Sequence, residues 1–327
     1  MKIFVTGGSG FVGGHLIEAL ARDGHEVAAL ARSDRAAETV KGYGARPVRG
    51  DLGAVTAAQI GDAEAVIHAA ARAEEWGTRA QFWEANVDGT TAVLAAAKEA
   101  GARRFIHVGT EAAIFAGQDL VHADETVPYP ARHRYLYAET KAEAERRVLA
   151  ASTPGFAALS IRPRFVWGPR DTSVLPAILD RARAGKFAWI DGGRALTSTT
   201  HVANVVHGLT LALTRGEGGR AYFVTDDGER TLREFLTALL DTQGVDLGTR
   251  VLPRAVARPL ARVVEGAWRA LRLTSTPPIT CFAADMLSST VTLDTSRARR
   301  ELGYAPVITV EEGLRRMREI SAGSSRS

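Results

Sequence analysis

The 327-residue sequence contains a single cysteine, Cys281, so an internal disulfide is excluded. No cysteines and histidines cluster at the spacing of metal ligands, and we therefore expect no metal site. A lone cysteine of this kind is more typical of a small buried apolar residue than of a nucleophile. No stretch approaches the ~20 uninterrupted apolar residues that a membrane-spanning helix needs, so we expect no integral membrane segment.

Concentrated charge is also missing, because 41 basic and 37 acidic residues are scattered along the chain and leave a net charge of +4. Without a basic stripe interleaved with aromatic residues, the composition argues against nucleic acid as a partner. Met1-Lys2 leads directly into the apolar Ile3-Phe4-Val5, which does not resemble a secretory signal. We therefore expect a cytoplasmic protein.

Short apolar runs alternate with alanine-rich helical windows over the first half of the chain. Two clear helical windows are 11–22 and 90–100, with Gly24 and Gly101 where helices should end. This βαβ rhythm predicts an α/β fold, a Rossmann-type doubly wound parallel sheet with its ligand at the carboxyl ends of the strands. The predicted strands are 3–6, 26–31, 46–49, 65–68, 104–108 and 157–161.

A glycine-rich segment follows the first predicted strand and opens the first helix. Gly7, Gly10 and Gly13 would allow a tight turn, a close approach of the backbone to a pyrophosphate, and packing of the helix on the strand. The free N–H groups at the start of the helix would meet the phosphates. We therefore predict a dinucleotide site, which also includes the intervening residues Ser9, Phe11 and Val12.

The end of the second strand should decide which dinucleotide binds. It carries no acidic residue to accept a hydrogen bond from a free ribose 2′-hydroxyl, whereas Arg32, helped by Ser33 and Arg35, could pair with a 2′-phosphate. This pattern favours NADP(H), with NAD(H) still possible if Arg32 is simply an exposed loop residue. Asp51-Leu52, after the third strand, could place a carboxylate near the adenine amino group, although an aspartate that merely ends a strand would look the same.

Tyr137 and Lys141 stand four residues apart, on one face of a predicted helix. A tyrosine ordinarily titrates near 10, so it exchanges a proton with a carbonyl or alcohol oxygen at neutral pH only if a positive charge favours its phenolate. Lys141 can supply that charge and reach the nicotinamide ribose. The pair therefore predicts acid/base chemistry, although an exposed helix pair would have the same spacing.

Further motifs extend the pattern along almost the whole chain, which resembles the extended short-chain dehydrogenases of the NAD-dependent epimerase/dehydratase superfamily. Within it, the sequence is most similar to the 3β-hydroxysteroid dehydrogenase branch. Besides the residues above, the resemblance rests on Asn86-Val87-Asp88-Gly89-Thr90, Arg162-Pro163, Val166-Trp167-Gly168-Pro169, His201-Val202-Ala203-Asn204-Val205-Val206 and Glu301-Leu302-Gly303-Tyr304-Ala305-Pro306.

The resemblance implies a third catalytic residue, a Ser or Thr just after the fifth strand. Thr110 supplies the hydroxyl there, but aligning the following Ile114-Phe115-Ala116 with the family pattern would place Glu111 at that position instead. Asn86 would support the cofactor and the neighbouring backbone, or else act only as a helix N-cap. Ala69, Ala70 and Pro163 are the remaining residues that we expect at the cofactor.

These features predict two units. Residues 1–165 form an NADP-binding domain that carries the catalytic residues, and residues 166–327 form mainly a smaller substrate-binding lobe, with some elements returning to the first domain. Residues 260–271 have the repeat of an amphipathic helix, which could pack on the lobe, close over an apolar substrate or touch a membrane surface. Residues 321–327 have the composition of a disordered end.

The predicted reaction interconverts a hydrophobic ketone and its secondary alcohol, such as a steroid-like or long-chain 3-oxo compound. A nucleotide-sugar epimerase or dehydratase with bound NAD is the alternative, in which Arg170 or Arg194 would bind a pyrophosphate. A non-catalytic NADP-binding sensor is the second alternative. The family resemblance further suggests a homodimer. The apolar substrate is inferred from the bulky residues Trp76, Phe82, Trp83, Phe115, Phe165, Trp167 and Trp189.

Overall fold

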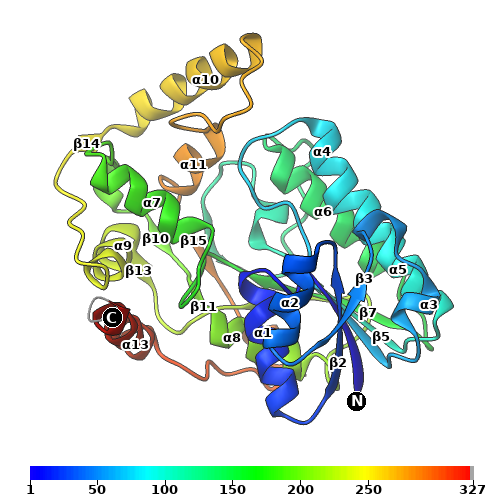
Figure 1. Cartoon of the computed structure of the whole chain (residues 1–327). Helices are drawn as coiled ribbons and strands as arrows, with labels where there is room; N and C mark the ends of the chain where they lie inside the picture. The colour runs from blue at the N-terminus through cyan, green and yellow to red at the C-terminus, as the bar shows by residue number, and fades with distance from the viewer. Residues whose placement is uncertain (325–327) are drawn as a thin grey trace.

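The computed structural model describes residues 1–324, and a seven-stranded parallel sheet with helices on both faces is its centre (Figure 1). The sheet order is β12-β7-β5-β4-β1-β2-β3, which confirms the predicted doubly wound topology. The strands are β1 (Lys2–Thr6), β2 (Glu26–Ala31), β3 (Arg46–Arg49), β4 (Ala65–His68), β5 (Arg104–Val108), β7 (Ala157–Pro163) and β12 (Ala221–Val224).

Two apolar layers hold the helices to the sheet. On one face lie α1 (Phe11–Arg22), α2 (Asp34–Gly42), α8 (Val202–Leu211) and α12 (Ser296–Leu302), whose buried side chains include Leu16, Val40, Leu209 and Leu302. On the other face lie α3 (Ala57–Ile60), α5 (Gly89–Glu99) and α6 (Leu136–Ala150). Successive residues of a strand point to opposite faces of the sheet. The almost entirely apolar strands β1 and β4 therefore contribute side chains to both layers, as buried parallel strands do.

The second half of the chain forms a lobe with its own core, but the two halves exchange elements. Strand β6 (Leu120–Ala123), from the first half, pairs with β15 (Val291–Leu293) in a four-stranded sheet that also contains β10 (Leu196–Thr197) and β13 (Arg230–Thr231). Conversely, β12, α8 and α12 return to the central sheet. Short pairs β8 (Val166–Trp167) with β11 (Thr200–His201), and β9 (Trp189–Ile190) with β14 (Val251–Leu252), complete the strands.

The remaining helices are α4 (Arg79–Trp83), α7 (Val174–Arg183), α9 (Leu232–Asp241), α10 (Arg254–Ala270), α11 (Cys281–Met286) and α13 (Val310–Ser324). Residues 321–324, expected to be disordered, continue α13, whereas 325–327 lie outside the described residues. Short 3-10 turns lie at Leu52–Ala54, Glu111–Ile114 and Asp191–Gly193, and Glu84–Asp88 is a π-helical turn.

The predicted amphipathic segment is helix α10, which extends outward from the lobe (Figure 1). Its small residues Ala257 and Ala261 are buried, while Val263 is 69% exposed. The helix therefore packs on the lobe by a narrow face of small side chains. Across residues 1–324, no helix combines the length and the apolar character that would let it cross a bilayer.

Candidate active site

The glycine-rich loop after β1 is shaped by close backbone contacts. Gly7 has a φ of +71°, and a Cβ there would lie 2.6 Å from the Ala70 backbone nitrogen. A Cβ on Gly13 would lie 2.1 Å from the Gly7 carbonyl oxygen. Helix α1 starts after Gly10 with neither a side-chain cap nor an acidic residue in its first turn, so its N–H groups are free to bind phosphate.

The end of β2 presents positive charge to solvent. Arg32 and Arg35 are exposed, and neither forms an ion pair with another residue in the described part of the chain. The acidic residue between them, Asp34, is paired with Arg49 at 3.2 Å. Ser33 is the N-cap of α2, where its hydroxyl accepts a hydrogen bond from a backbone N–H one turn along the helix. The predicted contact of these arginines with a 2′-phosphate stays a prediction.

Asp51 and Leu52 lie where the sequence predicts them, at the end of β3. The Asp51 carboxylate accepts a 3.3 Å hydrogen bond from the Gly53 backbone N–H and thereby caps a 3-10 turn. The Leu52 side chain packs against Gly89 at the start of α5. The structure thus gives Asp51 a local structural contact, and its predicted contact with adenine stays a prediction.

Asn86 joins the segment after β4 to helix α6. Its side chain accepts a hydrogen bond from the Arg72 backbone N–H at 2.7 Å and donates to the Arg72 carbonyl at 3.1 Å. It also donates to the Thr140 hydroxyl at 3.0 Å, one turn from Tyr137. Because Asn86 lies inside the π-helical turn, the alternative that it is a helix N-cap is wrong. The amide instead fixes how α6 sits against the nucleotide side of the sheet.

Tyr137 lies in the first turn of α6, beside the Thr110 hydroxyl. Burial and, secondarily, the nearby Glu111 carboxylate raise the pKa of the Tyr137 phenol, whereas a hydrogen bond with Thr110 lowers it. The Phe282 ring, from α11, approaches Tyr137 edge-on at 5.9 Å between centroids. The phenol is therefore protonated at neutral pH and is enclosed on one side by an apolar wall.

Lys141 is buried one turn further along α6. Its ammonium donates a 2.8 Å hydrogen bond to the Val108 carbonyl at the end of β5 and lies 3.2 Å from His107 Nε2. Burial lowers the pKa of Lys141 to about 8, and the negative charge of Glu145 acts in the opposite direction. The ammonium is thus directed at the end of β5, so a shift of its contacts is needed before it can meet a nicotinamide ribose.

The carboxylate of Glu145 belongs to a buried ion pair behind Lys141. Arg162 Nη2 lies 2.6 Å from Glu145 Oε1, and both side chains are less than 5% exposed. The hydroxyls of Ser160 and Tyr129 donate to the same carboxylate at 2.6 and 2.7 Å. These contacts lower the pKa of Glu145 and fix the part of α6 that follows Lys141 against β7.

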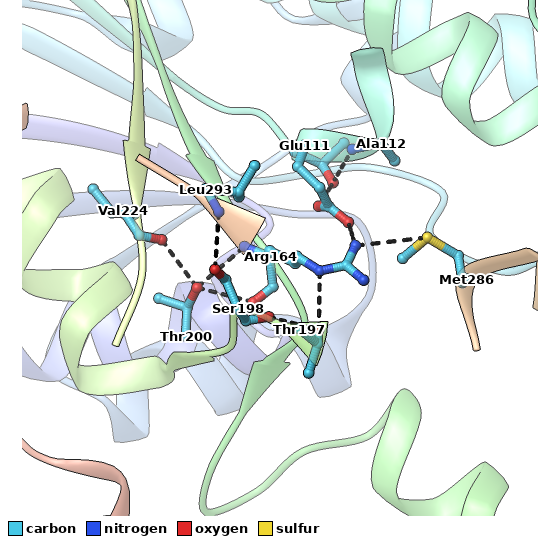
Figure 2. Close-up of polar contacts among 10 residues, drawn as sticks. Glu111, Ala112, Arg164, Thr197, Ser198, Thr200, Val224, Met286 and Leu293 are labelled. Carbon is cyan, nitrogen blue, oxygen red and sulfur yellow. Dashed lines mark hydrogen bonds and ion pairs between the residues drawn. The ribbon is translucent and has the colours of Figure 1, made fainter. Parts of the chain in front are cut away.

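A second buried ion pair lies behind Thr110 (Figure 2). Thr110 donates a 2.8 Å hydrogen bond to Glu111 Oε2, and Glu111 Oε1 lies 2.5 Å from Arg164 Nη1. Arg164 Nε donates to the Thr197 hydroxyl at 3.1 Å. The sequence left open whether Thr110 or Glu111 takes the third catalytic position; in the structure Thr110 meets Tyr137, while Glu111 is held by Arg164.

Sequence reasoning missed Arg164 and the residues of α11 that cover the site. A charged residue within the largely apolar run 157–167, such as Arg164, is a signal of a buried ion pair. Phe282 and Met286 follow one another by one helical turn on α11. They come from a part of the chain where the sequence offered no motif, and their contacts exist only after folding.

Three of the seven aromatic residues expected around an apolar cleft have other positions. Phe82 is fully buried, and Trp167 and Trp189 belong to the core of the lobe, where their indole N–H groups donate to the Asp226 carboxylate and to the Gly248 carbonyl. These three predictions are wrong because large aromatic side chains are the ordinary material of a core. Phe115 does lie in the same apolar cluster as Tyr137.

Arg170 and Arg194 do not form a pair at the site in the structure. Arg170 makes two hydrogen bonds to the Glu18 carboxylate on α1, at 2.9 and 2.5 Å, and stacks over the Tyr43 ring. Arg194 is exposed at the end of a 3-10 turn.

The free thiol of Cys281 is half-buried, and burial together with Glu265 raises its pKa to about 11, which is not the state of a reactive nucleophile.

Comparisons with known proteins agree with this geometry. A model of the NAD dependent epimerase/dehydratase family matches residues 3–224. A ketoreductase from Stigmatella aurantiaca that acts on 4-hydroxy-2-methyl-3-oxo-4-farnesyl-3,4-dihydroquinoline-1-oxide is 46% identical over 98% of this chain and 96% of its own length. A 2-alkyl-3-oxoalkanoate reductase from Stenotrophomonas maltophilia is 36% identical, over 98% of this chain and all of the relative.

Solved structures extend the comparison to the fold. The crystal structure of gox2253 superimposes with a TM-score of 0.80 and 26% identity over all of this chain and 98% of that one. The dTDP-glucose 4,6-dehydratase DesIV from Streptomyces venezuelae, with NAD bound, gives 0.77 at 23% identity, over all of this chain and 98% of its own. At that identity the likeness concerns the fold alone. The predicted resemblance to extended short-chain dehydrogenases is confirmed.

Proposed function

We propose that this chain, which belongs to the NAD dependent epimerase/dehydratase family, reduces a hydrophobic ketone to its secondary alcohol with NADPH, or catalyses the reverse. The chain is an NAD(P)-dependent oxidoreductase, since its relatives over the full length are reductases and dehydrogenases. The observation that supports the ketone reaction best is the half-buried Tyr137 side chain, which lies beside the Thr110 hydroxyl and one helical turn before Lys141.

The loop after β1 fits the pyrophosphate of a dinucleotide. A Cβ at Gly7 or Gly13 would collide with neighbouring backbone, so only glycine permits this tight loop, and the start of α1 has free N–H groups and no acidic residue. Further contacts would come from Asp51 after β3, from Ala69 after β4, and from Asn86 in the π-helical turn Glu84–Asp88. When it is bound, the nicotinamide supplies or accepts the hydride.

Side chains of the protein itself transfer the proton and stabilise the charge that results. In the reduction direction Tyr137 donates its phenolic proton to the ketone oxygen; its raised pKa keeps it protonated at neutral pH, and a nearby positive charge must favour release of the proton. Thr110, once its hydroxyl proton turns away from Glu111, donates a hydrogen bond to the same oxygen and holds it in line with the phenol. Lys141 then stabilises the phenolate by its positive charge, once its ammonium is released from the Val108 carbonyl. Each step reverses in oxidation.

The preference for NADPH over NADH is supported by the end of β2. Arg32 and Arg35 lack carboxylate partners within residues 1–324, and Asp34, which could repel a 2′-phosphate, is neutralised by Arg49. A guanidinium pairs well with a phosphate, and this charge-assisted contact is absent with NADH.

A hydrophobic substrate is supported by the wall around Tyr137. Phe282 and Phe115 belong to one apolar cluster with the tyrosine. The relatives carry names of farnesylated and 2-alkyl ketone substrates, which agree with such a wall. A nucleotide-sugar reaction is less well supported, since Arg170 is engaged by Glu18 on α1.

The test follows NADPH absorbance with purified protein and a panel of long-chain 3-oxo, steroid and aryl ketones. We expect oxidation of NADPH with apolar ketones, and a loss of at least about a hundredfold in kcat for Tyr137→Phe with unchanged NADPH binding. Tightly retained NAD and no net turnover would refute the proposal and support the sugar-nucleotide alternative. A Tyr137→Phe variant that equals the parent in every assay would support the sensor alternative.

A further inference from the structure

The guanidinium of Arg164 is buried and incompletely satisfied. Its side chain is 0% exposed, Nε donates to Thr197, and Nη1 pairs with Glu111 and contacts the Met286 sulfur at 3.7 Å. The other terminal nitrogen, Nη2, is buried and has no hydrogen-bond partner among the described residues (Figure 2). Two N–H groups without an acceptor in a dry environment are costly, so an acceptor from outside the chain is expected there.

Arg164 and Tyr137 lie under the same short helix. Phe282 and Met286, four residues apart on α11, point to one side of it, since residues at this spacing share a helix face. Phe282 contacts the Tyr137 ring, and Met286 contacts the Arg164 guanidinium. A molecule that enters between α11 and the sheet to reach the phenol therefore also meets Arg164.

Thr110 and Glu111 also connect the two residues: hydrogen bonds join Thr110, Glu111 and Arg164, and Tyr137 lies beside Thr110. Tyr137 meets the Thr110 hydroxyl, Thr110 donates to one oxygen of Glu111, and the other oxygen of Glu111 binds Arg164. The carboxylate thus holds the hydroxyl and the guanidinium in a fixed relation. The free Nη2 therefore belongs to the same hydrogen-bonded group as the Thr110 hydroxyl, which we expect at the ketone oxygen.

We propose that Arg164 Nη2 is a second polar anchor of this site, which donates to an oxygen acceptor carried by the substrate near its reacting ketone. This inference rests on the ketone reduction proposed above. Arg164 selects, among apolar ketones, those with a second oxygen a few bonds from the first. It is a specificity residue, and the proton transfer stays with Tyr137.

Charge decides which acceptor suits Arg164. Because Glu111 already neutralises the guanidinium, a substrate carboxylate would bring an additional, uncompensated negative charge into a buried site. A neutral but strongly dipolar oxygen, such as that of an amide, a second ketone or an N-oxide, accepts the hydrogen bonds without that cost. The anchor therefore favours neutral dipolar acceptors over carboxylates.

The experiment compares three probes with one chain length, namely 3-oxodecanamide, decan-3-one and 3-oxodecanoate. In the parent protein kcat/KM should be highest for the amide, by about tenfold over decan-3-one, which is the effect of one hydrogen bond to a charged donor. In Arg164→Lys, which keeps a charge for Glu111 but loses Nη2, this ratio should fall to about one, through KM rather than kcat. Arg170→Lys, a surface arginine outside the site, should keep the parent ratio.

The double variant Glu111→Gln/Arg164→Met removes both charges together, so it leaves no unpaired ion to unfold the protein. It should also lose the preference for the amide while melting cooperatively. An unchanged amide ratio in either variant, or 3-oxodecanoate as the best parent substrate, would overturn the anchor. If the parent reduces none of the three probes nor any ketone of the larger panel, the proposed function itself fails.

Discussion

Replacing Arg32 by alanine is expected to raise the Kd for NADPH about tenfold and to leave the Kd for NADH nearly unchanged. The arginine is exposed and has no ion pair to break within the described residues, so its removal exposes no buried group. Hydrogen bonds to charged groups contribute about 1.5–3 kcal/mol, and exposed ion pairs less than about 1 kcal/mol. A value of about 1.4 kcal/mol between these limits corresponds to the tenfold change.

The assay is a fluorescence titration of the parent and the variant with each nucleotide at low and high salt. Arg22→Ala is the matched control, because it removes the same charge from an exposed arginine at the opposite end of α1 from the glycine-rich loop. The NADPH preference of the parent should shrink at high salt, as exposed charge pairs are screened. An equal loss for NADPH and NADH in Arg32→Ala, or no loss for either, would refute the assignment of the 2′-phosphate to β2.

Three further predictions follow from the same geometry. Gly13→Ala should abolish nucleotide binding in titrations without preventing folding by circular dichroism, since its Cβ would lie 2.1 Å from the Gly7 oxygen. Because the pKa of Lys141 is about 8, kcat/KM for the cofactor should fall about tenfold between pH 7 and 9 but stay level in an active Lys141→Arg variant. Burial lowers the pKa of His68 to about 3, below its unfolded value of 6.5, so stability should be lost as pH falls below 6.5. In urea unfolding, the free energy of unfolding should be about 2 kcal/mol lower at pH 5 than above pH 6.5. In His68→Asn, this contribution to the pH dependence should be absent.

The local patterns of the sequence predicted the central sheet well because they are set by neighbours along the chain. The six predicted strands of the first half match β1 to β5 and β7 within one or two residues. The glycine spacing could be read because a tight turn needs glycine whatever surrounds it. The exchange of β6 into the lobe could not be predicted, since its partner Val291 is some 170 residues away and four-residue strands carry little register information.

The same distinction applies to the site residues: those close together in sequence could be predicted, and those that meet only in the folded chain could not. Tyr137 and Lys141 share one helix, so their spacing was visible, whereas Glu111 and Arg164 are 53 residues apart and meet only through the packing of η3, the 3-10 turn Glu111–Ile114, on the segment after β7. Likewise, Asn86 was predicted as a cofactor support or helix cap, and its link to Thr140 required the docked position of α6. Partners distant in sequence carry no periodic signal.

The buried charges around Tyr137 show why these distant pairs matter. Glu145 is neutralised by Arg162, and Glu111 by Arg164, so each carboxylate near the phenol has its own guanidinium. Lys141 has no carboxylate in ion-pair contact within residues 1–324, and His107 beside it is held neutral by its strongly lowered pKa. The ammonium is therefore the uncompensated charge of the cluster. Its positive field is available for the negative charge that develops on Tyr137, while Glu111, which raises the pKa of the phenol, opposes it and is partly offset by Arg164.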